Sequence, residues 1–361
     1  MRTVVFRLVL AFVGIVTALA LAEGVLRLMP ALDPHLGGHE RLFTFDDTLG
    51  WRFRAGVEET IVFPGEYRRV VRINESGFRD VPWTRDGERR VAILGDSFTS
   101  NLGVPVDSMF TRHLERRLGP DAVVRNYGVN GYNQVQELVL LDTEVLAWKP
   151  DLVLVVVYPR NDLDENVSRY WTARYDRPRA ELAEGQLEID TKVREHDDGS
   201  GSTWIEGLRL RVLARTLWYR MRPEAIPVHR IPPERRWSRT TWGADEQQAF
   251  DLTVETLTWM HARCEEVGVD FGVVLAPSLW QVRDDAWKRI ARDDMVRTEP
   301  QATLAKILEA WGLDVLDLLP SLRAVEGRLY YPSEQHWTPA AQRPVAAAIA
   351  ERWIEDVTPR R

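Results

Sequence analysis

The 361-residue chain contains a single cysteine, Cys264, so it cannot form an intramolecular disulfide. This thiol falls on the apolar face of a predicted helix, and we interpret it as a buried structural residue rather than a nucleophile. The six histidines other than His336 show no metal-ligand spacing, and no second cysteine is present to assist them. We therefore expect neither a disulfide framework nor a metal site.

Nucleotide-binding motifs and a basic charge balance are also missing. The chain has no Walker loop, and the glycines of the stretch Asn126–Gly131 lack the Gly-x-Gly-x-x-Gly arrangement of dinucleotide-binding turns. The net charge is −7, and the basic run Arg230–Arg239 is interpreted as a solvated loop. We find no internal repeat and no low-complexity tract. The sequence thus indicates no cofactor and no nucleic-acid partner.

The first 29 residues have the pattern of a membrane anchor or signal segment. Arg2 and Arg7 precede an uncharged run from Leu8 to Ala22, which predicts contact with the membrane through residues 4–29. The cationic flank predicts a cytoplasmic amino terminus and export of the remainder to the periplasm or cell surface. Ala20–Ala22 offers a cleavage site that would give a secreted protein. The helical pattern continues unbroken to Leu28, which favours an uncleaved single-pass anchor in the cytoplasmic membrane.

Residues 30–88 read as a linker followed by a small β subdomain. Residues 30–40 are rich in Pro, Gly and His, as linkers are. Alternating side chains between Val70 and Glu75 then predict a paired strand before a turn at Ser76-Gly77.

Residues 89–361 alternate between predicted strands and helices, which is typical of an α/β domain with a parallel sheet. The predicted strands are Val91–Leu94, Ala122–Asn126, Asp151–Tyr158, Asp270–Ala276 and Asp314–Leu318. The predicted helices are Asp107–Leu118, Gln136–Trp148, Asp245–Val267, Thr303–Trp311 and Val345–Ile354. An insertion at about 163–243 interrupts the pattern, and insertions of this length often serve as lids or specificity elements. Its tryptophans could stack on sugar rings or pack the insertion against the body.

Four predicted loops carry polar residues with a chemical use, and each follows a strand of the predicted sheet. They hold Ser97, the Asn-rich stretch Asn126–Asn133, Asn161-Asp162 and His336. Because parallel strands bring their carboxyl ends to one edge of a sheet, these residues could converge there. His336 could then act as a general base for Ser97 in acyl transfer. A glycine amide, the Ser97 amide and the Asn161 side chain are suitable donors to the oxyanion.

These residues resemble the sequence blocks of the SGNH or GDSL hydrolases. Gly95-Asp96-Ser97 is similar to the first block, and Asn126–Gly131 is similar to the second, with Gly131 at the oxyanion glycine. Asn161-Asp162 resembles the third block, although Pro159 replaces its usual glycine. The last block usually has Asp two or three residues before His336, where this chain has Glu334 and Ser333.

The resemblance implies a flavodoxin-like three-layer α/β/α sandwich with a catalytic Ser97 and His336. Glu334 could orient His336 in place of the usual aspartate, or the site could work as a Ser-His dyad. The stretches LGW and INESGFR look like those that precede the core of membrane-anchored bacterial members of the family.

Three functions are compatible with the sequence. The first is an extracytoplasmic serine esterase acting on a small acyl ester, with O-acetyl groups of envelope or secreted polysaccharide as a candidate substrate. The second is an O-acyltransferase that uses the same site to acylate a polysaccharide, although related acetyltransferases carry their Asp-x-His motif ahead of the serine. The third is a non-catalytic envelope protein that binds glycans or proteins. The sequence identifies no protein partner.

Overall fold

The computed structural model describes residues 2–28, 39–63, 66–168, 175–183, 186–196, 208–210, 213, 236–332 and 334–355. The chain divides into two units, of which the first comprises Met1–Gly38, Val62–Tyr67 and Asp197–Arg230. The second comprises His39–Ile61, Arg68–His196 and Ile231–Arg361, and it contains every candidate site residue.

In the first unit, helix α1 (Arg2–Leu26) is apolar and carries large exposed side chains such as Phe12, Ile15 and Leu19. Near its carboxyl end, Glu23 is 8% exposed and accepts the backbone N–H groups of Arg209 and Leu210 at 3.1 and 3.0 Å. No helix within the described residues has a stretch that is both long and apolar enough to cross a membrane. The anchor therefore stays a prediction.

The second unit is built on a five-stranded parallel sheet. Its strands are β5 (Arg89–Gly95), β6 (Ala122–Asn126), β7 (Leu152–Val157), β10 (Asp270–Leu275) and β11 (Asp314–Asp317), in the spatial order β11-β10-β7-β5-β6. Every neighbouring pair is parallel. Counted in chain order from the β6 edge, this is the 2-1-3-4-5 order of flavodoxin-like folds. The predicted parallel α/β sheet is confirmed.

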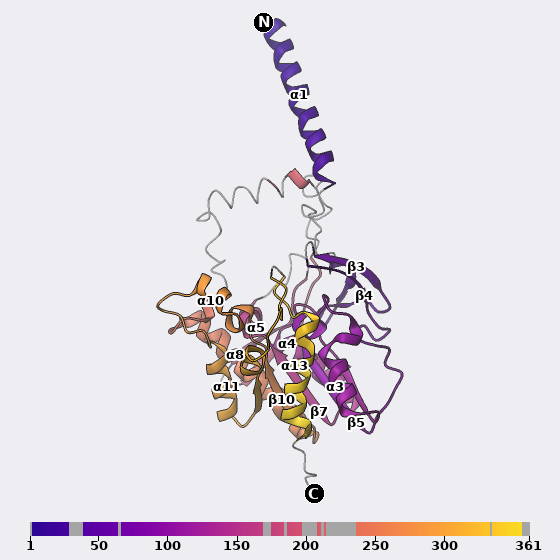
Figure 1. The fold of residues 1–361 in the computed structure, drawn as a ribbon, viewed down its shortest axis with the longest axis vertical. Helices are drawn as coiled ribbons and strands as arrows, with labels where there is room; N and C mark the ends of the chain where they lie inside the picture. Colours follow the sequence, from indigo (N-terminus) through magenta and orange to yellow (C-terminus); the bar gives the residue numbers. More distant parts are fainter. Residues whose placement is uncertain are drawn as a thin grey trace. The chain divides into compact units, whose positions relative to one another are not determined.

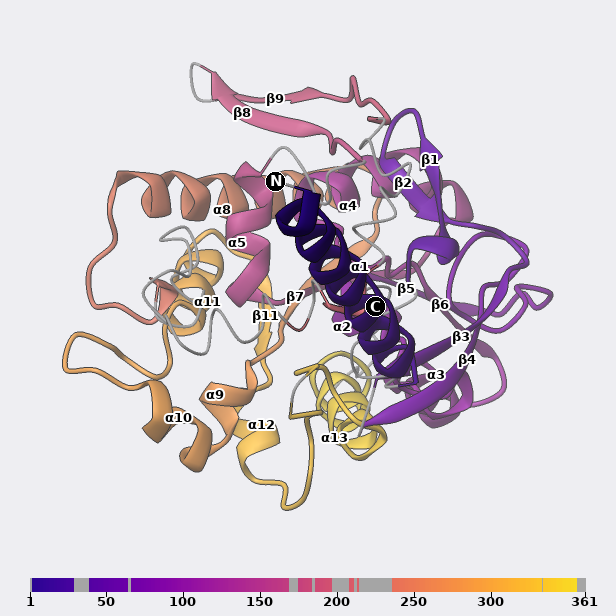
Figure 2. The same cartoon turned by 90° about the horizontal axis from the view of Figure 1, so that it is seen from above.

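Helices cover both faces of this sheet, which gives three layers (Figure 1 and Figure 2). Helices α3 (Phe110–Leu118) and α13 (Pro339–Ala350) pack together on one face. The other face is covered by α4 (Gln134–Leu140), α5 (Pro159–Val167), α8 (Ala244–Glu266) and α11 (Gln301–Ala310). Four shorter α-helices are α2 (Ser97–Ser100), α9 (Leu279–Val282), α10 (Asp284–Ile290) and α12 (Leu319–Arg323). Single turns of 3-10 helix lie at His39–Leu42, Val106–Ser108 and Leu146–Trp148, and π-helical turns at Leu141–Val145 and Glu351–Glu355.

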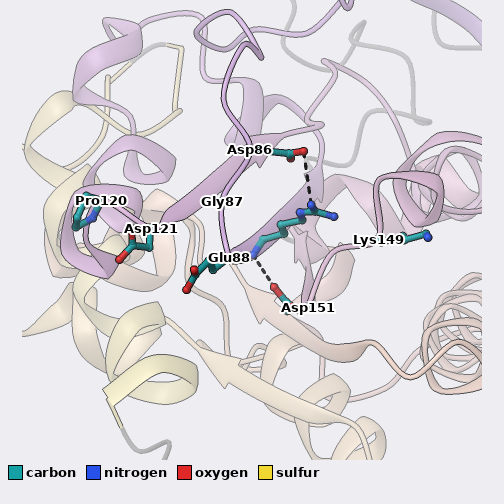
Figure 3. Close-up of a pocket in the computed structure, with 8 residues that line it drawn as sticks. Asp86, Gly87, Glu88, Pro120, Asp121, Lys149 and Asp151 are labelled. Atoms are coloured by element: carbon teal, nitrogen blue, oxygen red, sulfur yellow. Dashed lines mark hydrogen bonds and ion pairs between the residues drawn. The ribbon is translucent and has the colours of Figure 1, made fainter.

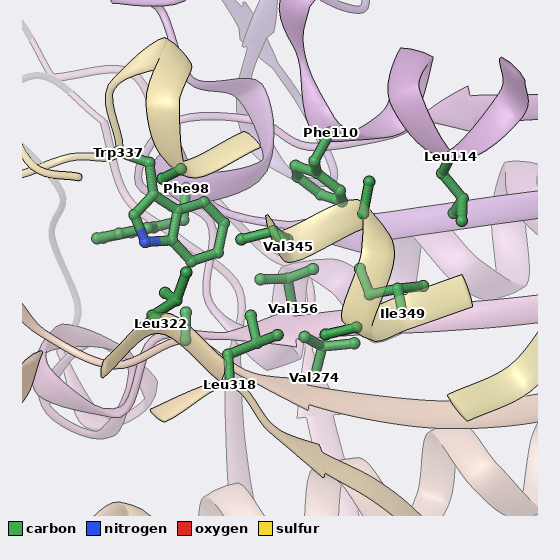
Figure 4. Close-up of a cluster of buried hydrophobic side chains, with 14 of the residues drawn as sticks. Phe98, Phe110, Leu114, Val156, Val274, Leu318, Leu322, Trp337, Val345 and Ile349 are labelled. Atoms are coloured by element: carbon green, nitrogen blue, oxygen red, sulfur yellow. The ribbon is translucent and has the colours of Figure 1, made fainter. Parts of the chain in front are cut away.

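One apolar cluster joins the sheet to the α3 and α13 layer (Figure 4). Val156 and Val274 of the strands meet Phe110 of α3 and Val345 of α13, all of them fully buried. Burial of a side chain of this size contributes about 1.5–3 kcal/mol. The same cluster includes Phe98 and Trp337, which neighbour Ser97 and His336 in the sequence. The core therefore fixes the backbone on both sides of the candidate site.

Residues 43–72, within the stretch predicted as a linker and small β subdomain, form two hairpins. Strands β1 (Phe43–Asp46) and β2 (Gly50–Phe53) pair antiparallel, and β3 (Glu58–Phe63) pairs with β4 (Tyr67–Arg72). In β2, the buried Trp51 donates its indole N–H to the Asn130 carbonyl at 3.1 Å and accepts the Tyr132 hydroxyl at 2.6 Å. The hairpin thus supports the loop that carries Gly131.

Two parts of the insertion are described. Strands β8 (Arg179–Ala183) and β9 (Gln186–Asp190) pair antiparallel, which confirms the hairpin that the sequence predicts over Ala180–Ile189. Trp237 is 1% exposed and packs edge-on against Trp242, which in turn packs against Phe250 of α8. These two tryptophans therefore join the insertion to the body of the unit. Trp171, Trp204 and Trp218 lie outside the described residues, as do most of residues 208–221, whose basic amphipathic pattern predicts a short helix.

Candidate active site

Ser97 lies at a sharp turn between β5 and the four-residue helix α2. The Asp96 side chain caps this helix and accepts the Phe98 N–H at 2.8 Å. Gly95 has φ +151°, and a Cβ there would lie 2.1 Å from Thr99 Oγ1, so only glycine fits the turn. Strands β5 and β7 flank the point at which the strand order reverses, where such sheets bind their ligands.

His336 meets Ser97 across the carboxyl edge of the sheet, with its Nε2 2.6 Å from Ser97 Oγ. The Tyr331 N–H donates to the His336 carbonyl at 2.9 Å, and an isolated bridge pairs Tyr330 with Trp337. Trp337 is fully buried and packs edge-on against Phe98, with ring centres 4.9 Å apart. The loop that carries His336 is therefore held by both backbone and core contacts.

Glu334 faces the other nitrogen of the imidazole. Its Oε1 lies 2.7 Å from His336 Nδ1, in a close contact that is not aligned with the N–H bond, and its Oε2 accepts the His336 backbone N–H at 3.1 Å. Burial lowers the pKa of His336, but the Glu334 carboxylate outweighs burial and leaves that pKa above its ordinary value. The glutamate therefore reaches the histidine despite its extra methylene. Ser333, the alternative position, lies outside the described residues.

The loop after β6 brings two glycines near this turn. Gly131 has φ +78°, and within the described part of the chain its N–H has no hydrogen-bond acceptor. Gly128 donates its N–H to Asn126 Oδ1 at 2.8 Å, and a Cβ there would lie 2.6 Å from the Thr99 side chain. Gly128 thus allows close packing against Thr99, whereas the backbone N–H of Gly131 is available to a ligand.

Asn161 approaches the site from the first turn of α5. Its Nδ2 lies 3.4 Å from Asp96 Oδ2, and that same oxygen lies 3.1 Å from Ser97 Oγ. Pro159 stands at the first helical position, where a missing N–H costs nothing, so it replaces the family's usual glycine without strain. Asp162 is buried and accepts the Tyr158 N–H at 2.8 Å, so it caps the helix.

Beneath Asn161 lies a group of buried acids, of which sequence reasoning singled out Asp162 alone. Burial and mutual repulsion raise the pKa values of Glu137 and Asp162 well above their ordinary values and that of Glu165 to about 7. Arg177 of the insertion opposes this shift at Glu165, because its Nη1 lies 3.6 Å from Glu165 Oε2. Only the spacing of acids along α5 hinted at this group. No local signal pointed to Arg177.

A hollow of about 570 Å³ lies elsewhere, at the amino ends of β5, β6 and β7 (Figure 3). Its walls include Glu88, Arg90 and Asp151, and Asp151 Oδ2 accepts the Arg90 backbone N–H at 2.6 Å. This is the opposite edge of the sheet from Ser97, so the hollow is separate from the candidate site. Among the described residues, no group of three or more His, Cys, Asp or Glu side chains could hold a metal ion.

Residues 236–359 match the family model described as "SGNH hydrolase-like domain, acetyltransferase AlgX". These residues are therefore similar to an SGNH hydrolase-like domain. The match includes Glu334 and His336, and it begins after Ser97, Gly131 and Asn161 in the sequence.

Solved structures resemble the chain more distantly. An acetylxylan esterase from Geobacillus stearothermophilus is 13% identical with a TM-score of 0.40, over 74% of this chain and 94% of that one. The acetyl xylan esterase AlAXEase is 12% identical with a TM-score of 0.42, over 73% of this chain and 100% of that one. No curated protein matches the chain. Resemblances this weak carry no argument about its reaction.

Proposed function

We propose that the protein is a serine esterase of SGNH type that cleaves an acyl ester through an acyl-Ser97 intermediate. The observation that carries the proposal is the 2.6 Å contact between Ser97 Oγ and His336 Nε2, with Glu334 on the second imidazole nitrogen. A hydroxyl, an imidazole and a carboxylate in this sequence of contacts form an activated nucleophile.

The reaction follows from these contacts. Ser97 Oγ attacks the carbonyl carbon of the ester while its proton passes to His336 Nε2. The tetrahedral intermediate collapses, the bond to the alcohol oxygen breaks, and His336 returns the proton to the leaving alcohol. Water then attacks the acyl-serine with His336 as base, which releases the carboxylic acid and restores the Ser97 hydroxyl. The Glu334 carboxylate stabilises the imidazolium formed in both halves.

The negative charge on the carbonyl oxygen requires donors that are already in place. The N–H groups of Ser97 and Gly131 and the side-chain amide of Asn161 come from three loops at the same sheet edge, which suits them to this role. Side chains, backbone amides and water supply every step, so the proposed chemistry needs no cofactor.

A small acyl ester is the proposed substrate class, with O-acetyl groups on envelope or secreted polysaccharide as the candidate. An O-acyltransferase on the same site is the second candidate, because the matching family model is described by an acetyltransferase. The two reactions share the acyl-serine and differ in whether water or a sugar hydroxyl takes the acyl group. Acylated product that forms only when polysaccharide is supplied would identify the transferase.

We also propose that α1 anchors the protein in the cytoplasmic membrane with the SGNH hydrolase-like domain outside the cytoplasm. The uncharged run from Leu8 to Ala22 behind Arg2 and Arg7 supports this placement. The full chain should remain with membranes in alkaline carbonate and be digested by protease added outside spheroplasts. Recovery in the soluble fraction would contradict the anchor.

Mass spectrometry of the full chain after fluorophosphonate treatment tests the enzymatic proposal. We expect one covalent adduct on Ser97, lost in Ser97→Ala and His336→Ala but kept in Ser108→Ala, a control outside the site. Each variant should melt at the temperature of the parent. A folded parent without an adduct would contradict the esterase and favour the third alternative, a protein that binds glycans or proteins without turnover.

A further inference from the structure

The side-chain amide of Asn161 is placed between two carboxylate oxygens. Its Nδ2 lies 3.4 Å from Asp96 Oδ2 and 3.3 Å from Glu165 Oε1. Above its pKa of about 7 the Glu165 carboxylate is ionised and only accepts hydrogen bonds, so it favours the amide orientation that presents N–H groups and disfavours the flipped one. One N–H of this amide faces Glu165, and the other faces Asp96 Oδ2, which also contacts Ser97 Oγ, so the second N–H lies beside the nucleophile.

Glu165 is itself held by a residue of the insertion. Arg177 Nη1 lies 3.6 Å from Glu165 Oε2 and donates to the Glu165 carbonyl at 2.8 Å. The Arg177 side chain is 1% exposed and that of Glu165 is 22% exposed, so solvent screens this pair only weakly. The positive charge counteracts the repulsion that Glu165 receives from Asp96 and Asp164.

The first β hairpin fixes the position of Arg177 in turn. The guanidinium carbon lies 5.5 Å from the centre of the Trp51 ring, and Tyr175 stacks on the same ring at 6.3 Å. Gly50, with φ +86°, allows the Asp176 carbonyl to approach, because a Cβ at residue 50 would lie 2.0 Å from that oxygen. A continuous series of contacts thus runs from β2 through Arg177 and Glu165 to Asn161.

We propose that Glu165, held by Arg177, is a positioning residue that binds one N–H of the Asn161 amide and thereby keeps the other N–H turned toward the oxyanion. This inference rests on the proposed function. The proposal gives residues 175–177 of the insertion a definite role, because Arg177 holds Glu165 and Glu165 holds the Asn161 amide. It also gives the Gly50-Trp51 pair a role, because that pair holds the insertion in place.

Glu165→Gln tests this role, because glutamine can present either an oxygen or an NH2 group to Asn161 and so admits both amide orientations. Loss of one oxyanion donor lowers kcat about 100- to 1,000-fold, which is the effect expected of Asn161→Ala. We expect Glu165→Gln to lower kcat by about 10- to 100-fold, a part of that donor effect. KM for a short-chain aryl ester should stay within about twofold, since the lost interaction forms only in the transition state.

The double variant Asn161→Ala/Glu165→Gln separates positioning from a general structural effect. If Glu165 acts through Asn161, the double variant should be no slower than Asn161→Ala alone. Losses that multiply would overturn the proposal. Glu326→Gln is the control, since Glu326 is an exposed glutamate outside the site. It should retain the parent kcat.

Glu165→Asp covers the case in which the glutamine variant does not fold. Aspartate keeps a negative charge opposite Arg177 but is one methylene shorter, so it withdraws from Asn161, and kcat should again fall with KM unchanged. Parent activity in a folded Glu165→Asp or Glu165→Gln protein would overturn the positioning role while the esterase proposal stands. A parent protein with no fluorophosphonate adduct on Ser97 would instead reject the proposed function itself.

Discussion

Glu334→Gln removes the charge that faces His336 Nδ1 and keeps the volume of the side chain. A hydrogen bond to a charged group contributes about 1.5–3 kcal/mol, and 1.36 kcal/mol corresponds to one decade in rate. The Glu334 contact is close at 2.7 Å but poorly aligned, and the glutamate side chain is 12% exposed. We therefore expect kcat for an aryl ester to fall by about 10- to 150-fold, the range that those energies give.

The pH dependence of the same variant supplies an independent measurement. His336 must be neutral to accept the Ser97 proton, so kcat/KM of the parent should fall as the pH drops through the His336 pKa. Glu334 holds that pKa above its ordinary value, because it stabilises the charged imidazole. The acid limb should therefore move to lower pH in Glu334→Gln, together with the loss in kcat.

Stopped-flow and steady-state assays of parent and variant between pH 5 and 9 would measure both quantities. A thermal melt confirms folding, and Glu326→Gln is a control at an exposed glutamate outside the site. An unchanged kcat with an unmoved acid limb would refute the role of Glu334 and leave a Ser-His dyad.

Further substitutions and labelling probe the packing around the site. Gly128→Ala places a Cβ 2.6 Å from Thr99 atoms, so urea unfolding should show a loss of about 1–3 kcal/mol, and parent stability would contradict the close packing. Burial raises the pKa of Cys264 to about 12, so a thiol reagent at pH 8 should react only after denaturation, and labelling of the folded protein would contradict the burial. Gly50→Ala forces the Asp176 carbonyl away, so both the Tm and kcat should fall. An unchanged kcat would contradict the proposed coupling between β2 and Asn161.

The sheet was predictable because its strands are strongly apolar and separated by helical spacing. β6 has the predicted bounds, and the buried β7 falls within the predicted Asp151–Tyr158. Helix ends were less predictable. The helix predicted to begin at Asp107 begins instead at Phe110, because residues 106–108 form a 3-10 turn and Met109 precedes α3. Thr338 caps α13 and proline follows it, so this helix begins six residues before the predicted Val345.

The side chains of the site were predictable where they followed strands, whereas the residues that hold them in place were not. Ser97 and Asn161 follow β5 and β7, so topology alone places them near each other. The reach of Glu334 depends on a local turn, since Gln335 has φ +68°, a conformation that no residue type in the motif signals. Arg177 contacts Glu165 through tertiary packing. Hydrophobic periodicity and residue propensity describe local structure and cannot predict such a contact.

The contact between Ser97 and His336 joins residues that are 239 positions apart in the sequence. During synthesis, a ribosome at about 5–20 residues per second would produce the serine many seconds before its base. The Ser97 hydroxyl remains an unactivated alcohol until the segment around Trp337 packs against Phe98. A nascent chain without that segment therefore cannot form an acyl-serine. During refolding, ester turnover should therefore appear later than the far-ultraviolet circular dichroism signal of helices and strands. Activity then reports formation of the long-range contact between Ser97 and His336.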